Sequence, residues 1–246
     1  MSYKIISLLA QEKVKVNNQE LTAIYDKIWQ NAKPRIQKQQ LELDPYRSKG
    51  LVDPRRGLTL LIDFATVATP EILKLLKEAQ KIEPNQSWYA KENLHLSLYS
   101  LIDFDDQDEE KVLSFEFLQK YQKVIEEAVS DFPAFEVSLK GITAGSGAVL
   151  VQGFSDGWLQ KLRDRINQAL IKHNLPLYNR TILNHISILR YSKPITNVSN
   201  FCDFIAANRD KPLGKVFIKA VKFVKNDWYN SPDKTRLIKE YNLVAL

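Results

Sequence analysis

The spacing of hydrophobic and polar positions predicts a chain that mixes strands and helices. Residues 19–33 carry apolar side chains at helical spacing, residues 57–64 form an aliphatic run typical of a buried strand, and residues 94–99 alternate strictly. From residue 57 onward, strands and helices follow one another in two similar halves. The predicted strands span 57–64, 88–101, 135–143, 148–154, 181–190, 215–224 and 236–244, and the predicted helices 70–83, 108–129, 156–173 and 198–208. This order indicates an α+β protein with two pseudo-equivalent sheets.

Turn and cap residues set several of these boundaries. Thr69 is a predicted N-cap, because Pro70 follows at the first helical position. Residues 145–147 are a glycine-rich turn that predicts a hairpin between two strands. The helix at 19–33 is followed by Pro34 and a polar connecting stretch that ends in two Asp-Pro pairs. We therefore divide the chain into an N-terminal helical extension and linker, residues 1–50, and a domain of two lobes, residues 51–246.

The scarce residue types exclude several classes of site. With three histidines and one cysteine, the 246-residue chain cannot form a cysteine-rich zinc site or an intrachain disulfide. Its eight glycines contain neither a P-loop nor a dinucleotide fingerprint. We therefore expect neither a bound metal nor a cofactor. No stretch is long enough to span a bilayer, and the N-terminal apolar run is too short for a signal peptide. These features predict a cytoplasmic protein without membrane contacts, and we expect a monomer.

Two of the three histidines occur in the same short motif. His95-x-Ser97 and His185-x-Ser187 lie in corresponding predicted strands of the two halves. Because strand side chains alternate between faces, the imidazole and hydroxyl of each motif share one face. A single copy is explained as well by a strand histidine beside a locally bonded serine, but the matched pair favours a function. His173 lies near a predicted helix end, where an interaction with the helix dipole accounts for it.

Two imidazoles flanked by hydroxyls suit phosphodiester hydrolysis without a metal. One neutral imidazole can take a proton from water or a ribose hydroxyl, while a protonated one gives a proton to the departing oxygen. The ordinary histidine pKa of about 6.5 allows both states near neutral pH. Hydroxyl groups can donate hydrogen bonds to the non-bridging phosphate oxygens as charge develops. All four groups would have to converge on one phosphate.

These motifs resemble those of the 2H phosphoesterase superfamily, which includes bacterial RNA 2',3'-cyclic phosphodiesterases, also called 2'-5' RNA ligase-like proteins. The resemblance covers about residues 55–246 and rests on His-Leu-Ser-Leu, His-Ile-Ser-Ile and the order of strands and helices around them. It implies a bilobal fold with pseudo-two-fold symmetry, in which two antiparallel sheets with helices packed outside flank a central cleft. It also implies activity on cyclic phosphates or 2'-5' linkages with no metal requirement, and it assigns catalysis to His95, Ser97, His185 and Ser187.

The resemblance also marks Arg190 as a phosphate-binding residue, because many members follow the second histidine with the pattern His-x-Thr-x-x-Arg. Strict alternation puts Arg190 on the opposite face from His185, so it needs a bulge or a strand end to reach the site. Serine replaces the commoner threonine in both motifs, which keeps the hydroxyl and loosens the side chain. Strict alternation places Tyr99 on the same face as His95, and Tyr191 follows Arg190. Both are candidates for stacking on a base, although packing in the core or at the rim explains them equally well.

Other residues near the motifs are open to two interpretations. Trp88 and Tyr89 could also stack on a base, and Arg55 and Arg56 could line the cleft, although a solvated pair is the simpler interpretation of the two arginines. The net charge of +6 is concentrated in residues 211–246, which hold eight Lys or Arg and three Asp or Glu. Such a balance is compatible with an anionic ligand, and these lysines could extend the cleft.

Two functions of different class fit the sequence. The first is a phosphodiesterase that hydrolyses a 2',3'-cyclic phosphate, or a related 2'-5' or cyclic phosphodiester bond, with two histidines as general base and general acid. Its substrate would be an RNA end, a cyclic nucleotide or an oligonucleotide. The alternative is a non-catalytic module that binds RNA ends or cyclic oligonucleotides in the same cleft. Association without turnover would distinguish the second function from the first.

Overall fold

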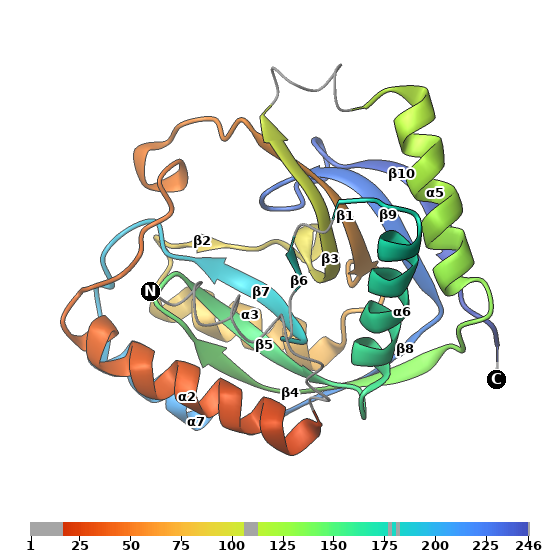
Figure 1. Cartoon of the computed structure of the whole chain (residues 1–246). Helices are drawn as coiled ribbons and strands as arrows, with labels where there is room; N and C mark the ends of the chain where they lie inside the picture. The colour runs from red at the N-terminus through yellow and green to blue at the C-terminus, as the bar shows by residue number, and fades with distance from the viewer. Residues whose placement is uncertain (1–16, 106–112, 177–178, 181–182, 246) are drawn as a thin grey trace.

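A computed structural model describes residues 17–105, 113–176, 179–180 and 183–245, and these residues form two five-stranded antiparallel sheets (Figure 1). The first sheet has the order β10-β9-β1-β3-β6 and the second β2-β7-β5-β4-β8. The strands are β1 (Arg55–Asp63), β2 (Ser87–Trp88), β3 (His95–Asp105), β4 (Phe135–Ala144), β5 (Ala148–Phe154), β6 (Asn179–Arg180), β7 (His185–Arg190), β8 (Pro212–Ile218), β9 (Ala220–Asp227) and β10 (Arg236–Asn242). The predicted α+β class and its two antiparallel sheets are confirmed.

Helices cover the outer side of each sheet (Figure 1). The pair α5 and α6 packs against the first sheet at β10 and β3, whereas α2, α3 and α7 pack against the second sheet at β4, β5 and β8. The helices are α2 (Asn18–Gln37), α3 (Pro70–Ile82), α5 (Phe115–Val129), α6 (Trp158–Lys172) and α7 (Val198–Ala207), and the short 3-10 turns are η1 (Arg47–Lys49) and η2 (Lys91–Asn93). None of the helices in the described part of the chain is long and apolar enough to cross a membrane.

Two predicted strands are each divided between the two sheets. The strand predicted at 88–101 is β2 in the second sheet and β3 in the first, with the turn η2 between them. The strand predicted at 215–224 is β8 in the second sheet and β9 in the first, with a break at Lys219. The burial pattern records this break, because the buried positions Ile218 and Val221 are three residues apart instead of two. The prediction of one continuous strand at 88–101 and another at 215–224 was therefore wrong.

Other boundaries also differ from the prediction. The helix expected to end before Pro34 continues to Gln37, and Pro34 is exposed, so the carbonyl that loses its donor can bind water. Helix α5 begins after the N-cap Ser114, whose side chain accepts a hydrogen bond from Phe117 N. The earlier part of the predicted helix 108–129, residues 108–112, lies outside the described residues, as do residues 181–182 of the predicted strand 181–190. The predicted cap at Thr69 and the hairpin between β4 and β5 are confirmed.

The N-terminal helix α2 shares the core of the domain that follows it. Trp29, Ala32 and Ile36 belong to the main buried cluster, which spans both sheets and the other helices. Leu21 and Tyr25 form a smaller cluster with a buried leucine next to β7. The predicted boundary at residue 50 thus separates helix α2 from a domain whose core it shares.

Candidate active site

One open pocket of about 170 Å³ brings both histidine motifs together. His95 and Ser97 reach it from β3, and His185 and Ser187 reach it from β7. The two strands belong to different sheets and lie side by side in the centre of the molecule (Figure 1). A single ligand can therefore contact both motifs at once.

A bulge in β7 turns Arg190 into the same pocket. Ser187 pairs with Leu150 and Leu189 pairs with Val149, so Ile188 is an extra residue without an opposing partner. The extra residue reverses the alternation, and Arg190 lines the pocket together with His185. Strict alternation would have placed Arg190 on the other face, and the bulge is the irregularity that it needed.

A corresponding bulge in β3 turns Tyr99 away from the pocket. Ser97 pairs with Leu61 and Tyr99 pairs with Leu60, so Leu98 is the extra residue. Tyr99 is only 1% exposed, and its hydroxyl donates to Asn167 Oδ1 at 3.0 Å. Ser100 lines the pocket instead.

The other aromatic residues predicted to stack on a base are also buried or do not line the pocket. Tyr191 is fully buried in an edge-to-face contact with Phe201. The indole N–H of Trp88 donates to the Glu83 carbonyl at 2.7 Å, and Trp88 does not line the pocket. Tyr89 does line it but is 4% exposed. The structure therefore does not bring Tyr99 or Tyr191 to the site.

The surroundings of His95 fix its tautomer. Its Nδ1 lies 2.8 Å from the Asn93 carbonyl, which can only accept, so Nδ1 carries the proton and Nε2 keeps its lone pair when the ring is neutral. Burial lowers the pKa of His95 below its ordinary value of 6.5, and the Arg190 cation acts in the same direction. The Asn93 carbonyl and the carboxylates of Asp63 and Asp227 oppose this shift.

The surroundings of His185 also disfavour its protonation. Burial and the cations of Arg190 and Arg163 lower the pKa of His185 to about 3, with a further contribution from His95. Only the Leu183 carbonyl is found to act in the opposite direction among the described groups. In the free pocket, burial therefore favours the neutral form of both rings near pH 7.

Arg163 of α6 connects the two motif strands, although sequence reasoning did not identify it. Its fully buried guanidinium donates to the carbonyls of Leu98 and Ser97 at 3.1 and 3.2 Å. It also donates to Leu183 O at 3.2 Å and to Asn184 Oδ1 at 2.6 Å, immediately before the second motif. A signal was present in the sequence, because position 163 lies on the apolar face of the predicted helix 156–173.

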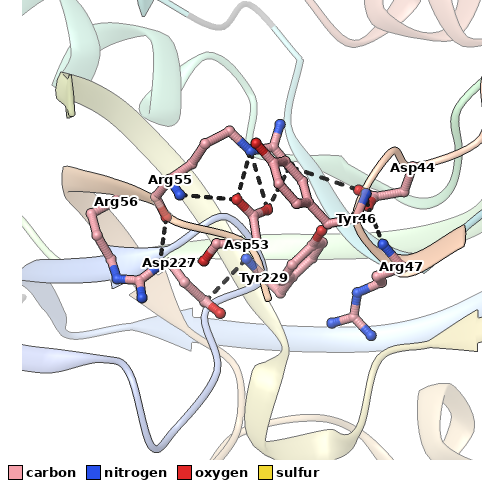
Figure 2. A network of polar contacts seen from close by, with 8 residues as sticks. All are labelled: Asp44, Tyr46, Arg47, Asp53, Arg55, Arg56, Asp227 and Tyr229. Atoms are coloured by element: carbon pink, nitrogen blue, oxygen red, sulfur yellow. Dashed lines mark hydrogen bonds and ion pairs between the residues drawn. The ribbon is translucent and has the colours of Figure 1, made fainter. Parts of the chain in front are cut away.

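The rim of the pocket is formed by β1 and the loop after β9. Arg56, Asp227 and Trp228 line it, whereas Arg55 instead forms a two-pronged ion pair with Asp53 (Figure 2). Among the described residues that line the pocket there is no lysine. The C-terminal lysines Lys211, Lys215, Lys222 and Lys239 form ion pairs with carboxylates. The expected extension of the cleft by these lysines is not seen.

Within the described residues, no three side chains of His, Cys, Asp or Glu come close enough together to hold a metal ion. Neither a protein-family model nor a curated protein sequence matches the chain. Its similarity to known proteins is therefore found at the level of structure.

The two-sheet fold is similar to that of E. coli LigT and of a phosphoesterase of known structure. The matching structures include E. coli LigT in complex with 3'-AMP, with 19% sequence identity and a TM-score of 0.52 over 77% of this chain and 99% of LigT. A phosphoesterase matches with 18% identity and a TM-score of 0.50 over 78% of this chain and 99% of its own. The protein TT0787 of Thermus thermophilus matches with 15% identity and a TM-score of 0.50 over 76% and 97%. The predicted resemblance is confirmed for the fold.

Proposed function

We propose that this protein is a metal-independent phosphodiesterase that hydrolyses a 2',3'-cyclic phosphate, or a related 2'-5' or cyclic phosphodiester bond, in RNA ends or nucleotides. The observation that carries the proposal is the shared pocket, which both His-x-Ser motifs and Arg190 line. E. coli LigT, which has the same fold, was solved with 3'-AMP, and this supports a nucleotide phosphate as the ligand here.

In the proposed reaction His185 is the general base and His95 is the general acid. His185 stays neutral because burial and then the cations of Arg190 and Arg163 lower its pKa, so it can take a proton from the attacking water. The water oxygen forms a new bond to phosphorus as the bond to the ribose oxygen breaks. Protonated His95 gives its Nε2 proton to that departing oxygen. The products are a free hydroxyl and a phosphomonoester.

The remaining lining groups serve the phosphate. The hydroxyls of Ser97 and Ser187 and the guanidinium of Arg190 can donate to the non-bridging oxygens, where negative charge develops. In the free pocket the charge of Arg190 lowers the pKa of both histidines. A bound phosphate anion offsets this charge and so raises both pKa values. Substrate binding therefore favours protonation of His95 and prepares the acid that the reaction needs.

The test is hydrolysis of adenosine 2',3'-cyclic phosphate in the presence of EDTA. We expect His95→Ala and His185→Ala each to lower turnover about 10²- to 10⁴-fold, because each removes one proton-transfer group. His173→Ala is the matched control, because His173 pairs with Glu127 on the surface and is expected to leave turnover unchanged. Thermal unfolding of each variant checks that the fold is intact. Undiminished turnover in both single variants would contradict the proposal.

The alternative function, a non-catalytic module that binds RNA ends or cyclic oligonucleotides, uses the same pocket and predicts a different result. It predicts saturable, salt-sensitive association of the cyclic nucleotide with the wild-type protein and no phosphomonoester product. Product identified as a 2'- or 3'-monophosphate would rule it out.

A further inference from the structure

We propose that Trp228 forms a stacking subsite for a nucleobase at the rim of the histidine pocket. The inference rests on the proposed function, because it takes the phosphate of the same ligand to lie among the histidines. It narrows the substrate class to one that carries a base next to the reacting phosphate. Small base-free cyclic phosphates would be poor ligands.

Trp228 combines exposure with a position on the pocket. It follows β9 directly and lines the same pocket as both histidines, yet it is 38% exposed. The aromatic residues that the sequence suggested for stacking are buried or lie away from the pocket. An indole ring that is exposed beside a phosphate site is suited to stack on a flat base, an interaction that every nucleobase can make.

The ring is supported by a fixed cation. The Arg55 guanidinium carbon lies 4.7 Å from the centre of the Trp228 ring and 4.8 Å from that of Tyr46, so it contacts both rings. Asp53 holds this guanidinium through contacts of 2.5 Å from Nη2 and 2.9 Å from Nε (Figure 2). Arg55 itself does not line the pocket.

The loop that carries Trp228 is held on both sides of the residue. The Asp227 carboxylate accepts from the backbone N–H groups of Tyr229 at 3.1 Å and Ser231 at 2.8 Å. The Tyr229 hydroxyl donates to Asp44 Oδ1 at 2.8 Å, and the Arg47 guanidinium carbon lies 3.8 Å from the Tyr229 ring centre (Figure 2). The ring is therefore positioned before a ligand binds, which reduces the entropy lost on stacking.

The size of the pocket fits a ligand whose phosphate lies inside the pocket and whose base lies at its rim. Its volume of about 170 Å³ is below the roughly 300–1,000 Å³ of pockets that enclose a whole drug-sized ligand. The phosphate and part of the sugar can enter, and a base must lie at the rim. Trp228 and Arg56 are the large side chains that the loop after β9 and the start of β1 place there.

The test is equilibrium binding of 3'-AMP and of an abasic tetrahydrofuran 3'-phosphate. Both probes are monoesters, so their binding does not depend on turnover. We expect wild-type protein to prefer 3'-AMP by about fivefold or more, because stacking on one base contributes roughly 1–3 kcal/mol. Trp228→Ala should remove this preference without weakening the abasic probe, and Trp228→Phe should keep most of it. Phe115→Ala, at a strongly exposed aromatic residue outside the pocket lining, is the matched control and should change neither affinity.

A fluorescence titration gives a second readout that a purely structural role would not change. We expect 3'-AMP to quench wild-type emission more than that of Trp228→Phe, which retains the other three tryptophans. Equal affinity of the wild type for both probes, or equal loss of both in Trp228→Ala, would overturn the subsite. If the preference depends on Trp228 but no cyclic phosphate is hydrolysed, the subsite stands and the proposed hydrolase fails.

Discussion

The pKa of each motif histidine depends on its burial and on the carbonyl and the charges around its ring. The Asn93 carbonyl and two carboxylates oppose the lowering of the His95 pKa by burial, whereas the cations of Arg190 and Arg163 add to the lowering of the His185 pKa by burial. The same motif thus has different charged neighbours in the two halves. In the proposed mechanism this difference supports His185 as the base and His95 as the acid, two roles that the sequence left open.

The assignment predicts an acid-shifted pH profile. The reactive free enzyme has neutral His185 and protonated His95, so kcat/KM should fall as pH rises through the His95 pKa, which lies below 6.5. On the acid side, kcat/KM should fall only as pH approaches the His185 pKa of about 3. The alkaline limb of kcat should lie at higher pH than that of kcat/KM, because the bound phosphate anion favours protonation of His95. Hydrolysis of adenosine 2',3'-cyclic phosphate from pH 4 to 9 at constant ionic strength measures the alkaline limbs of kcat/KM and kcat.

Arg190→Gln provides the control for this profile. It removes a cation that lowers the pKa of both histidines, so the alkaline limb of kcat/KM should move upward. A wild-type kcat/KM that is flat from pH 5 to 8, or that falls only above pH 7, would contradict the assigned roles.

Bulges in β3 and β7 decide which side chains of these strands reach the pocket. Local alternation was sufficient to predict the motif strands and the shared face of each histidine and serine. It could not locate the extra residues Leu98 and Ile188, because a bulge is defined by pairing with a neighbouring strand. The prediction for Arg190 included the need for a bulge, whereas that for Tyr99 assumed unbroken alternation and placed it on the wrong face.

The helix α6 fixes these irregular strands through Arg163. Replacing Arg163 with Met should destabilise the fold by about 3 kcal/mol or more, because several buried acceptors on the two motif strands lose a charged donor. Urea unfolding measures the loss. Arg165→Met, two residues further along on the exposed side with a surface ion pair to Asp131, is the control and should change stability by less than about 1 kcal/mol. Similar small changes in both variants would show that Arg163 does not hold the strands.

At the scale of the whole molecule, the two halves exchange strands. The short strand β2 of the first half pairs with β7, and the short strand β6 of the second half pairs with β3. Each motif strand is therefore flanked on one side by the opposite half of the chain. The sequence showed the repeated halves, but strands of two residues have no hydrophobic period from which their pairing could be predicted.

The N-terminal helix α2 contributes buried side chains to the core, so its removal tests whether residues 51–246 can fold alone. Trp29 is 8% exposed and belongs to the main core, so Trp29→Ala should cost about 3–5 kcal/mol, whereas the exposed neighbour Gln30→Ala should cost little. A fragment of residues 51–246 loses every buried side chain of α2, and each large one contributes roughly 1.5–3 kcal/mol. That sum is comparable to the whole stability of a typical domain, so we expect the fragment to lack a cooperative thermal transition. A fragment that unfolds cooperatively near the full-length midpoint would instead show that residues 51–246 fold independently.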